Sequence, residues 1–482
     1  MFSSKNRRGY RVITSDLSVK ELLDITGGIL ISGRPELSFA GITIDSRKVT
    51  EGDLFIAIPG KRYDGHDFVG EAAKNGARGI VVQRNVPVEL GNTLVIAVPD
   101  TVAALGDIAR AFRARFTGTV IAITGSSGKT TTKEMVAAVL ERRWHVHKTQ
   151  GNLNNLIGVP LTIFGLKKEH EVLVLELGTN QPGEISRLGW IVKPNIACVT
   201  NIGPAHLEGL GSIEGVAKEK TALFDCIAES GTAIINVDDP ILRDKGKKLC
   251  GRKITFGLNP AADVTIQGEI KTGKEGAIFD LRINGKSKRV TLPLPGKHNV
   301  MNALAASAIS MSAGASLDDI ATGLESLKAV SGRMEIIILR DGIVLINDVY
   351  NANPASCEAA LEFLFSSKGR GKSFVILGDM LELGEEGEER HKILGEKLVD
   401  TGVEKAYLKG NLVKFTAQGA REKGWTAGKV AFFDEVENLL MDLGSLLSPG
   451  DWILVKGSRG MKMEEVVEGI LRRFGQDAGG EA

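Results

Sequence analysis

Residues 120–140 read VIAITGSSGKTTTKEMVAAVL, and this stretch decides the fold. The β-branched residues Val120, Ile121 and Ile123 predict a buried parallel strand, and the apolar residues between Met135 and Leu140 predict a helix after it. Between the two, the glycines predict a tight turn whose backbone N–H groups point inward at the positive end of that helix. Such a turn forms an anion cradle that suits a polyphosphate.

The ending GKT gives this turn its expected chemistry. Lys129 can reach the β- and γ-phosphates of a nucleotide, and the hydroxyl of Thr130 can bind Mg²⁺. The strict pattern G-x-x-x-x-G-K-[ST] would require glycine at position 123, where Ile123 stands, so the loop is the shorter T-G-x-x-G-K-T type. A glycine-rich turn is often only a turn, but the strand before it and the helix after it favour an ATP site. The residues expected to hold the nucleotide are Gly125, Ser126, Ser127, Gly128, Lys129, Thr130 and Thr131.

Composition limits the class of protein. The 482 residues suffice for about three domains at roughly 150 residues each. The 60 basic and 59 acidic residues leave a net charge of +1, so we expect no nucleic-acid partner and no anionic membrane. Because no long apolar run is present, we expect neither an integral membrane segment nor a leader. The four cysteines are scattered, so they predict neither a disulfide framework nor a metal knuckle. We expect a cytoplasmic monomer.

The order of the predicted elements indicates an α/β protein with domains at residues 1–98, 99–329 and 330–482. In the second domain, strands that are apolar on both faces alternate with helices, which predicts a parallel sheet covered on both sides. Residues 262–295 alternate instead and predict an antiparallel annex. In the third domain, a second alternation of strands and helices predicts a doubly wound, Rossmann-like sheet.

Several polar residues follow predicted strands, where ligands of parallel sheets bind. Glu176 ends an apolar strand and could bind Mg²⁺, and His206 follows the next strand. Lys220 lies in a predicted helix, where its position alone favours an exposed lysine. Arg333 falls at the second domain junction. Asp348 ends a strand, and the residues after it suit either sugar hydroxyls or ordinary turn chemistry.

These features together resemble the Mur ligase family, the ATP-dependent amide-forming enzymes of bacterial cell-wall synthesis. The loop TGSSGKTTTKE is followed by Glu176, His206, Lys220, the helix of His298 and Asn299, Gly332-Arg333 and Asp348, in the family's order and spacing. The resemblance covers essentially the whole chain. It implies a central P-loop, parallel-sheet ATPase domain between an N-terminal α/β domain that binds a UDP-sugar and a C-terminal Rossmann-like domain.

Five stretches resemble the family members with one particular activity. That activity is the addition of D-alanyl-D-alanine to UDP-N-acetylmuramoyl-tripeptide in peptidoglycan synthesis. The five stretches are residues 151–162, 176–185, 347–354, 376–384 and 455–464. Residues 45–60 and 64–68 resemble the part of the first domain that holds the UDP-sugar. Gln181 departs from the pattern, since many relatives carry histidine or another residue there. The third residue of the peptide, lysine or diaminopimelate, is left open.

The resemblance implies a role for each candidate. Lys129 would neutralise the transferring phosphoryl group, Thr130 and Glu176 would hold one Mg²⁺, and His206 would help hold a second. Lys220 would carry a carbamate, an anion able to serve Mg²⁺. Asn299, Arg333 and Asp348 would contact the base, phosphate and ribose of ATP. Substrate contacts would come from Ser46, Arg47, Asn154, Asn180, Tyr350 and Asn351, with Lys456, Ser458 and Arg459 at the dipeptide carboxylate.

The implied reaction runs through an acyl phosphate, because a carboxylate is too poor an electrophile to condense with an amine in water. Three alternatives stay open from the sequence. The chain could be a ligase of the same family that acts on the preceding peptide or on folate polyglutamates. It could be a P-loop phosphotransferase or GTPase, although no N-K-x-D motif is present. It could also be a non-catalytic nucleotide-binding module, against which Lys129, Thr130 and Glu176 argue together.

Overall fold

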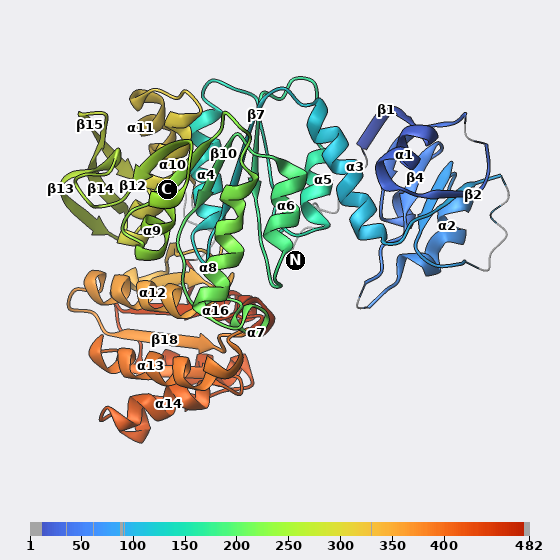
Figure 1. Cartoon of the computed structure of the whole chain (residues 1–482). Coiled ribbons are helices and arrows are strands. Elements are labelled where there is room, and N and C mark those ends of the chain that lie inside the picture. The colour runs from blue at the N-terminus through green and yellow to red at the C-terminus, as the bar shows by residue number, and fades with distance from the viewer. Residues whose placement is uncertain are drawn as a thin grey trace, which may run out of the picture. The chain divides into compact units, whose positions relative to one another are not determined.

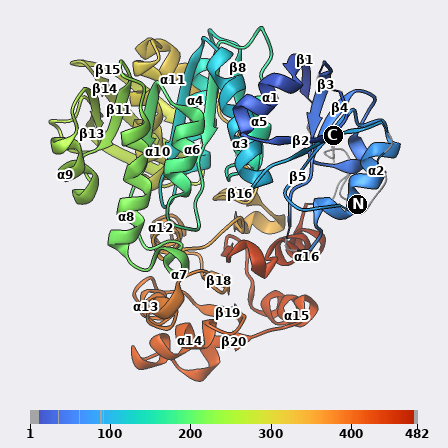
Figure 2. The ribbon, with the colours of Figure 1, turned by 45° about the vertical axis from the view of Figure 1, so that its right-hand side comes forward.

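The computed structural model describes residues 12–34, 36–60, 62–86, 90, 92–328 and 330–476 (Figures 1 and 2). The chain divides into two compact units. Unit 1 contains residues 1–122, 144–178 and 184–195, and unit 2 contains residues 123–143, 179–183 and 196–482. Within the described ranges, no helix combines the length and the apolar character needed to cross a bilayer.

Unit 1 contains a six-stranded sheet in the order β1-β3-β4-β5-β6-β2. Strands β3 to β6 are parallel, and the edge strands β1 and β2 are antiparallel to their neighbours. Helix α1 begins after Ser18, whose side chain caps it, and it ends at Gly27, which has φ +61°. The elements are β1 Val12–Ser18, α1 Val19–Thr26, β2 Ile29–Ser32, β3 Ser38–Thr43, η1 Ser46–Lys48, β4 Asp53–Ile56, η2 Gly65–Phe68, α2 Val69–Lys74, β5 Gly79–Val82 and β6 Leu94–Ala97.

The rest of unit 1 begins at a helix that Asp100 caps, since its carboxylate accepts bonds from the amides of Val102 and Ala103. Trp190 stacks between two arginines, with the Cζ atoms of Arg110 and Arg187 at 3.7 and 4.5 Å from a ring centroid. The contact of Arg110 with Trp190 links α3 to α6, whereas Arg187 and Trp190 both belong to α6. The elements are α3 Thr101–Arg115, the first part of β7 Thr119–Thr124, β8 Val146–Lys148, α5 Gly158–Phe164, β9 Val172–Glu176 and α6 Glu184–Val192; β8 and β9 are parallel.

In unit 2, the sheet within residues 119–292 has the strand order β15-β14-β13-β12-β11-β10, followed by the end of β7. Strands β10, β11 and β12 are parallel. The residues predicted as an antiparallel annex continue this sheet, because Val264 of β13 pairs in parallel with Phe256 of β12. The elements are α4 Lys129–Leu140, β10 Ile196–Val199, α7 Leu207–Leu210, α8 Ile213–Thr221, η3 Ala222–Cys226, β11 Thr232–Asn236, α9 Pro240–Lys248, β12 Arg252–Phe256, β13 Val264–Gly273, β14 Gly276–Ile283, β15 Lys286–Leu292, α10 Lys297–Ser312 and α11 Leu317–Glu325.

The C-terminal part of unit 2 contains the sheet β16-β17-β21-β18-β19-β20, in which only β16 is antiparallel to its neighbour. Both faces are buried: Ile346 belongs to the apolar cluster under α13 and α14, and Leu345 to the cluster under α15 and α16. Figure 2 shows these helix pairs on opposite sides of β18 and β19. The elements are β16 Glu335–Ile338, η4 Arg340–Gly342, β17 Val344–Asp348, α12 Pro354–Ser367, β18 Ser373–Gly378, η5 Gly384–Glu386, α13 Gly387–Asp400, β19 Lys405–Lys409, α14 Val413–Glu422, η6 Ala427–Lys429, β20 Val430–Phe432, α15 Val436–Leu446, β21 Trp452–Lys456, η7 Arg459–Met461 and α16 Glu464–Phe474.

The three sheets agree with the predicted architecture. One lies within residues 12–97, one within 119–292 and one within 335–456, and the last is doubly wound as expected. The α/β class is therefore confirmed. The boundaries at 98/99 and 329/330 stay predictions, and residue 329 lies outside the described ranges.

The close packing of α13 on α14 predicts the effect of a single methyl group. A Cβ atom at Gly395 would lie 2.0 Å from the carbonyl oxygen of Thr416. Gly395→Ala should therefore destabilise the fold by about 1–3 kcal/mol, as overpacking does, and lower the thermal midpoint. Gly428→Ala is the control, since a Cβ atom there would have no other atom within 4 Å. Equal midpoints for the two variants would contradict this packing.

Candidate functional site

The glycine-rich loop between β7 and α4 is held by the end of β10. The amides of Ser126 and Ser127 donate to the backbone oxygen and the side-chain oxygen of Asn201, each at 3.0 Å. The hydroxyl of Thr200 donates to the carbonyl of Ser127 at 2.6 Å. A Cβ atom at Gly125 would lie 1.9 Å from the Thr200 hydroxyl oxygen. The loop therefore takes its shape from one neighbouring strand and from the absence of a side chain at Gly125.

Lys129 and Thr130 begin α4, where the sequence predicts them. The ammonium of Lys129 folds back over the loop and donates to the carbonyl of Gly125 at 2.7 Å. The Thr130 hydroxyl accepts a bond of 2.8 Å from the guanidinium of Arg333. Thr131 follows, half-buried, in the first turn of α4. The structure thus brings Arg333 to the phosphate loop, as expected of a residue that contacts phosphate.

Asn302 is a site residue that the sequence interpretation missed. Its amide oxygen would be 2.2 Å from a Cβ atom at Gly128, and its amide nitrogen donates to the side chain of Asn299 at 3.1 Å. Asn299 in turn donates to the carbonyl of Pro295 at 2.7 Å. Both asparagines are buried on α10. The spacing of three residues on one helix was the signal that could have found Asn302.

His206 forms a pair with Glu382, which the sequence interpretation also missed as a site residue. His206 Nδ1 lies 2.6 Å from Glu382 Oε2, and the amide of Glu208 donates to the carbonyl of Glu382 at 3.2 Å. The hydrogen bond from His206 lowers the pKa of Glu382. Because the carboxylate engages Nδ1, the pair leaves Nε2 as the ring nitrogen that a metal or a substrate can use.

A cavity of about 170 Å³ joins the phosphate loop to loops of the C-terminal sheet. Ser126, Lys129, Ala205 and His206 line it from the nucleotide-binding region. The remaining lining residues come from the ends of β17, β18 and β21: Asn351, Ala352, Asn353, Leu381, Glu382, Leu383, Ser458, Arg459 and Gly460. A cation of the phosphate loop and an arginine of the C-terminal loops thus face one space.

Lys220 is 1% exposed, so it is not the exposed helical lysine that its position alone favours. Burial, and then the positive charge of Lys129, hold the pKa of Lys220 well below its ordinary value, while Glu219 acts in the opposite direction. The carboxylate of Glu219 already accepts bonds from the Thr179 hydroxyl and the Gly183 amide, at 3.1 and 2.7 Å. This environment favours the neutral form of the Lys220 amine.

Asp348 and Lys456, expected at the ribose and at the dipeptide, form a buried ion pair with each other. Lys456 Nζ lies 2.5 Å from Asp348 Oδ2 and 3.0 Å from the carbonyl of Asn351. The other carboxylate oxygen of Asp348 accepts from the amide of Met334 at 3.1 Å. Of the three predicted dipeptide contacts, Ser458 and Arg459 line the cavity and Lys456 is not among its lining residues.

The predicted UDP-sugar residues lie in unit 1. The hydroxyl of Ser46 donates to Glu71 at 2.6 Å. The guanidinium of Arg47 makes two bonds of 2.8 Å to Asp45 and lowers its pKa. Ser46 is buried and Arg47 is solvent-exposed. Their contact with a nucleotide sugar stays a prediction.

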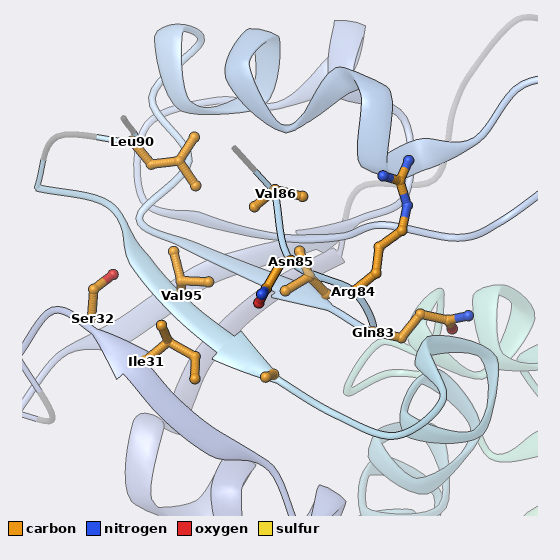
Figure 3. A pocket seen from close by; sticks show the side chains of 10 residues that line it. Ile31, Ser32, Gln83, Arg84, Asn85, Val86, Leu90 and Val95 are labelled. Atoms are coloured by element: carbon orange, nitrogen blue, oxygen red, sulfur yellow. The ribbon is translucent and has the colours of Figure 1, made fainter. Parts of the chain in front are cut away.

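A hollow of about 690 Å³ lies between β2, β6 and the segment after β5 (Figure 3). Its apolar wall includes Ile31, Val86, Leu90 and Val95. Arg84 contributes its stem, while its guanidinium donates to Asp67 at 2.7 Å. Ser46 and Arg47 are not among the lining residues, so the hollow is separate from the predicted sugar contacts.

Glu176 and Asn154 are neighbours in unit 1. Glu176 ends β9, is 2% exposed and accepts a bond of 2.8 Å from the amide nitrogen of Asn154. Its own amide donates to the hydroxyl of Thr149 at 3.0 Å. Asn180, in contrast, lies exposed after β9 in unit 2. The buried carboxylate is thus oriented by polar partners, as expected of a functional residue and unlike an ordinary surface glutamate.

The residues present fit a nucleotide, and they suit Mg²⁺ in the way that ATP-dependent enzymes bind it. Among the described residues, no group of three or more His, Cys, Asp or Glu side chains could hold a metal by itself. Mg²⁺ usually takes one or two protein ligands and completes its shell with phosphate oxygens and waters. Within unit 2, the hydroxyl of Thr130 and Nε2 of His206 are donors of that kind. Glu176, a carboxylate donor, lies in unit 1, and its part in a metal site stays a prediction.

Comparisons with known proteins agree with this geometry. Family models match the chain as "Mur ligase middle domain" at residues 123–310, "Mur ligase, glutamate ligase domain" at 332–459 and "Mur ligase family, catalytic domain" at 38–113. The UDP-N-acetylmuramoyl-tripeptide–D-alanyl-D-alanine ligase of Bacillus subtilis is 38% identical, over 94% of this chain and 98% of that protein.

Solved structures give the same result. MurF from Acinetobacter baumannii superimposes with a TM-score of 0.87 at 33% identity, covering 96% of this chain and all of that one. MurF ligase from Thermotoga maritima in complex with ADP superimposes with a TM-score of 0.80 at 32% identity, covering 89% of this chain and 96% of that one. The fold and the site therefore define an ATP-dependent ligase with a P-loop. The chain belongs to the Mur ligase family.

The contact between Gly128 and Asn302 predicts the effect of a methyl group in the phosphate loop. Gly128→Ala would place a Cβ 2.2 Å from Asn302 at a φ of +78°, so the loop must change shape. The Kd for ADP, measured by calorimetry, should rise roughly tenfold or more, as strain of this kind implies. Gly203→Ala is the matched control, since its Cβ would meet only Ser126, at 3.9 Å. Unchanged ADP binding by the Gly128 variant would contradict this account.

Proposed function

We propose that this chain joins D-alanyl-D-alanine to UDP-N-acetylmuramoyl-tripeptide at the expense of ATP, giving UDP-N-acetylmuramoyl-pentapeptide, ADP and phosphate. The observation that carries the proposal is the cavity shared by Lys129 and Ser126 of the phosphate loop with Ser458 and Arg459 of the C-terminal loops. The name of the Bacillus subtilis relative, 38% identical over nearly the whole chain, supports this choice of substrates.

The first step is transfer of a phosphoryl group. A carboxylate oxygen of the tripeptide attacks the γ-phosphorus of ATP, the bond from that phosphorus to the bridging oxygen breaks, and ADP leaves. Lys129 moves from the carbonyl of Gly125 to the phosphoryl oxygens and offsets their charge. Mg²⁺, held by Thr130, Glu176 and His206, would supply further charge neutralisation.

The second step forms the amide. The neutral amine of the dipeptide attacks the carbonyl carbon of the acyl phosphate, a tetrahedral intermediate forms, and the C–O bond to phosphate breaks. Arg459 binds the dipeptide carboxylate through two parallel N–H bonds, and Ser458 turns its hydroxyl from the carbonyl of Ala352 to the same carboxylate. Fixing both reactants in one small cavity supplies orientation and keeps out water that would hydrolyse the intermediate.

Lys220 serves the reaction as a carbamate. Its neutral amine attacks CO₂, a C–N bond forms, and one proton leaves, so a lysine that would repel Mg²⁺ becomes a ligand with two oxygens. The lowered pKa of Lys220 supports this step, because only the neutral amine reacts.

The experiment that tests the function is mass analysis of the product. With UDP-N-acetylmuramoyl-tripeptide, ATP and D-alanyl-D-alanine, the pentapeptide should form, and Lys129→Ala should reduce turnover roughly 10²-fold or more. Without dipeptide, hydroxylamine should trap the acyl phosphate as a hydroxamate. If the enzyme extended the preceding peptide or a folate instead, the chain would be another ligase of the family. ATP turnover without an amide product would argue against any ligase activity.

The carbamate predicts a rescue experiment on α8. Lys220→Ala should be nearly inactive, and acetate should restore part of its activity by supplying the missing oxygen ligands. Lys218→Ala, an exposed lysine on the same helix, is the control and should behave as the wild type. Intact-protein mass measured without acid should show the extra CO₂ in the wild type and not in Lys220→Ala. A fully active Lys220→Ala enzyme would exclude this role.

A further inference from the structure

Two guanidinium groups lie over the ring of Tyr350. The Cζ atom of Arg333 is 3.8 Å from the ring centroid, and the Cζ atom of Arg459 is 5.6 Å from it. Arg333 reaches the phosphate loop, and Arg459 lines the cavity assigned to the dipeptide. The half-buried ring thus lies against one cation near the phosphate loop and one cation near the cavity assigned to the dipeptide.

Arg333 is fixed by its backbone as well as by the ring. Gly332 and Met334, on either side of it, have φ of +74° and +50°. The amide of Tyr350 donates to the carbonyl of Gly332 at 3.0 Å. Residues 332 and 350 are therefore joined directly, so the ring and the guanidinium are presented by one rigid corner. From this corner the side chain spans to Thr130.

Arg459 is held less firmly. The backbone before it is fixed by Ser458, whose hydroxyl accepts from the amide of Leu381 at 2.9 Å and donates to the carbonyl of Ala352 at 3.3 Å. The Arg459 side chain itself is 68% exposed, forms an ion pair with Glu464 and lies over the Tyr350 ring. An exposed ion pair orders a long side chain weakly. The ring face is a second partner of the guanidinium, and it belongs to residue 350, next to the cavity-lining Asn351.

We propose that Tyr350 is a positioning residue, whose aromatic ring sets Arg333 against the phosphate loop and Arg459 against the dipeptide carboxylate. The face of an aromatic ring attracts guanidinium groups, and it can do so for two cations that would otherwise repel each other. This role differs from the substrate contact expected of Tyr350, because it requires the ring and does not require the hydroxyl. The part that concerns the dipeptide rests on the proposed function.

The test compares Tyr350→Phe, which keeps the ring, with Tyr350→Leu, which removes it. Tyr350→Leu should raise the Kd for ADP and the KM for D-alanyl-D-alanine by about 3- to 20-fold each, the range that loss of a cation–π contact implies. The kcat should change less than either constant. Tyr350→Phe should stay within about twofold of the wild type. Tyr350→Met replaces the Leu variant if the latter does not fold.

A double mutant separates this proposal from the proposed function. If Tyr350 acts on the dipeptide through Arg459, Tyr350→Leu should add nothing to the rise in KM caused by Arg459→Ala. Additive effects would overturn the proposal, as would a Phe variant as impaired as the Leu variant or an unchanged Kd for ADP. An Arg459→Ala enzyme with an unchanged KM for the dipeptide would instead overturn the proposed role of Arg459, while ADP binding would still test Tyr350 on Arg333.

Discussion

The nucleotide site depends on the lack of room for a Cβ atom at two positions of one loop. Thr200 occupies the space beside Gly125, and Asn302 occupies the space beside Gly128. The end of β10 and the start of α10 therefore press directly on the backbone of the phosphate loop. In return, the end of β10 gives the loop hydrogen bonds, so that it keeps one shape. Lys129, Thr130 and their partner Arg333 are placed by that shape.

Several cationic side chains lie around this loop. The protein reduces the repulsion between them mainly through neutral partners, with few carboxylates. Lys129 bonds to a carbonyl oxygen, and Lys220 is buried with a lowered pKa. The guanidinium of Arg333 donates to the Thr130 hydroxyl and lies over the aromatic ring of Tyr350. The nearby acids Glu219 and Glu382 are engaged with other groups. The site is thus built to receive its negative charge from ligands, as an enzyme for phosphoryl transfer requires.

Much of the fold could be predicted because its signals are local. The strand, turn and helix of residues 120–140, the cap at Asp100 and the alternation in the C-terminal sheet all depend on neighbours in the sequence. The sheet position of β13 could not be predicted this way, since one pairing between Phe256 and Val264 decides it. For the same reason the sequence indicates a ligand contact for Lys456, whereas the structure pairs this lysine with Asp348, 108 residues away.

Site residues followed the same division. Lys129 and Thr130 are marked by a motif, whereas Lys220 is indicated only by the family resemblance, because its helix reads as solvent-exposed. Glu382 lies in the stretch 376–384 that carries the resemblance, but its pairing had no local signal, since its partner His206 is 176 residues distant. The sequence suggests a polar contact for Tyr350, yet in the structure its ring contacts two arginines. Residue type indicated where chemistry could occur, and long-range contacts decided which atoms take part.

The anchoring of the phosphate loop on Thr200 and Asn201 also has a consequence for synthesis on the ribosome. These partners follow Ser127 by 73 and 74 residues, so the loop cannot acquire its final hydrogen bonds when it leaves the exit tunnel. At roughly 5–20 residues per second, the delay is on the order of 4–15 seconds. During that interval the apolar strand β7 must stay unaggregated while it waits for β10. In the first sheet, β2 waits in a similar way for β6, because Ile29 pairs with Ala97.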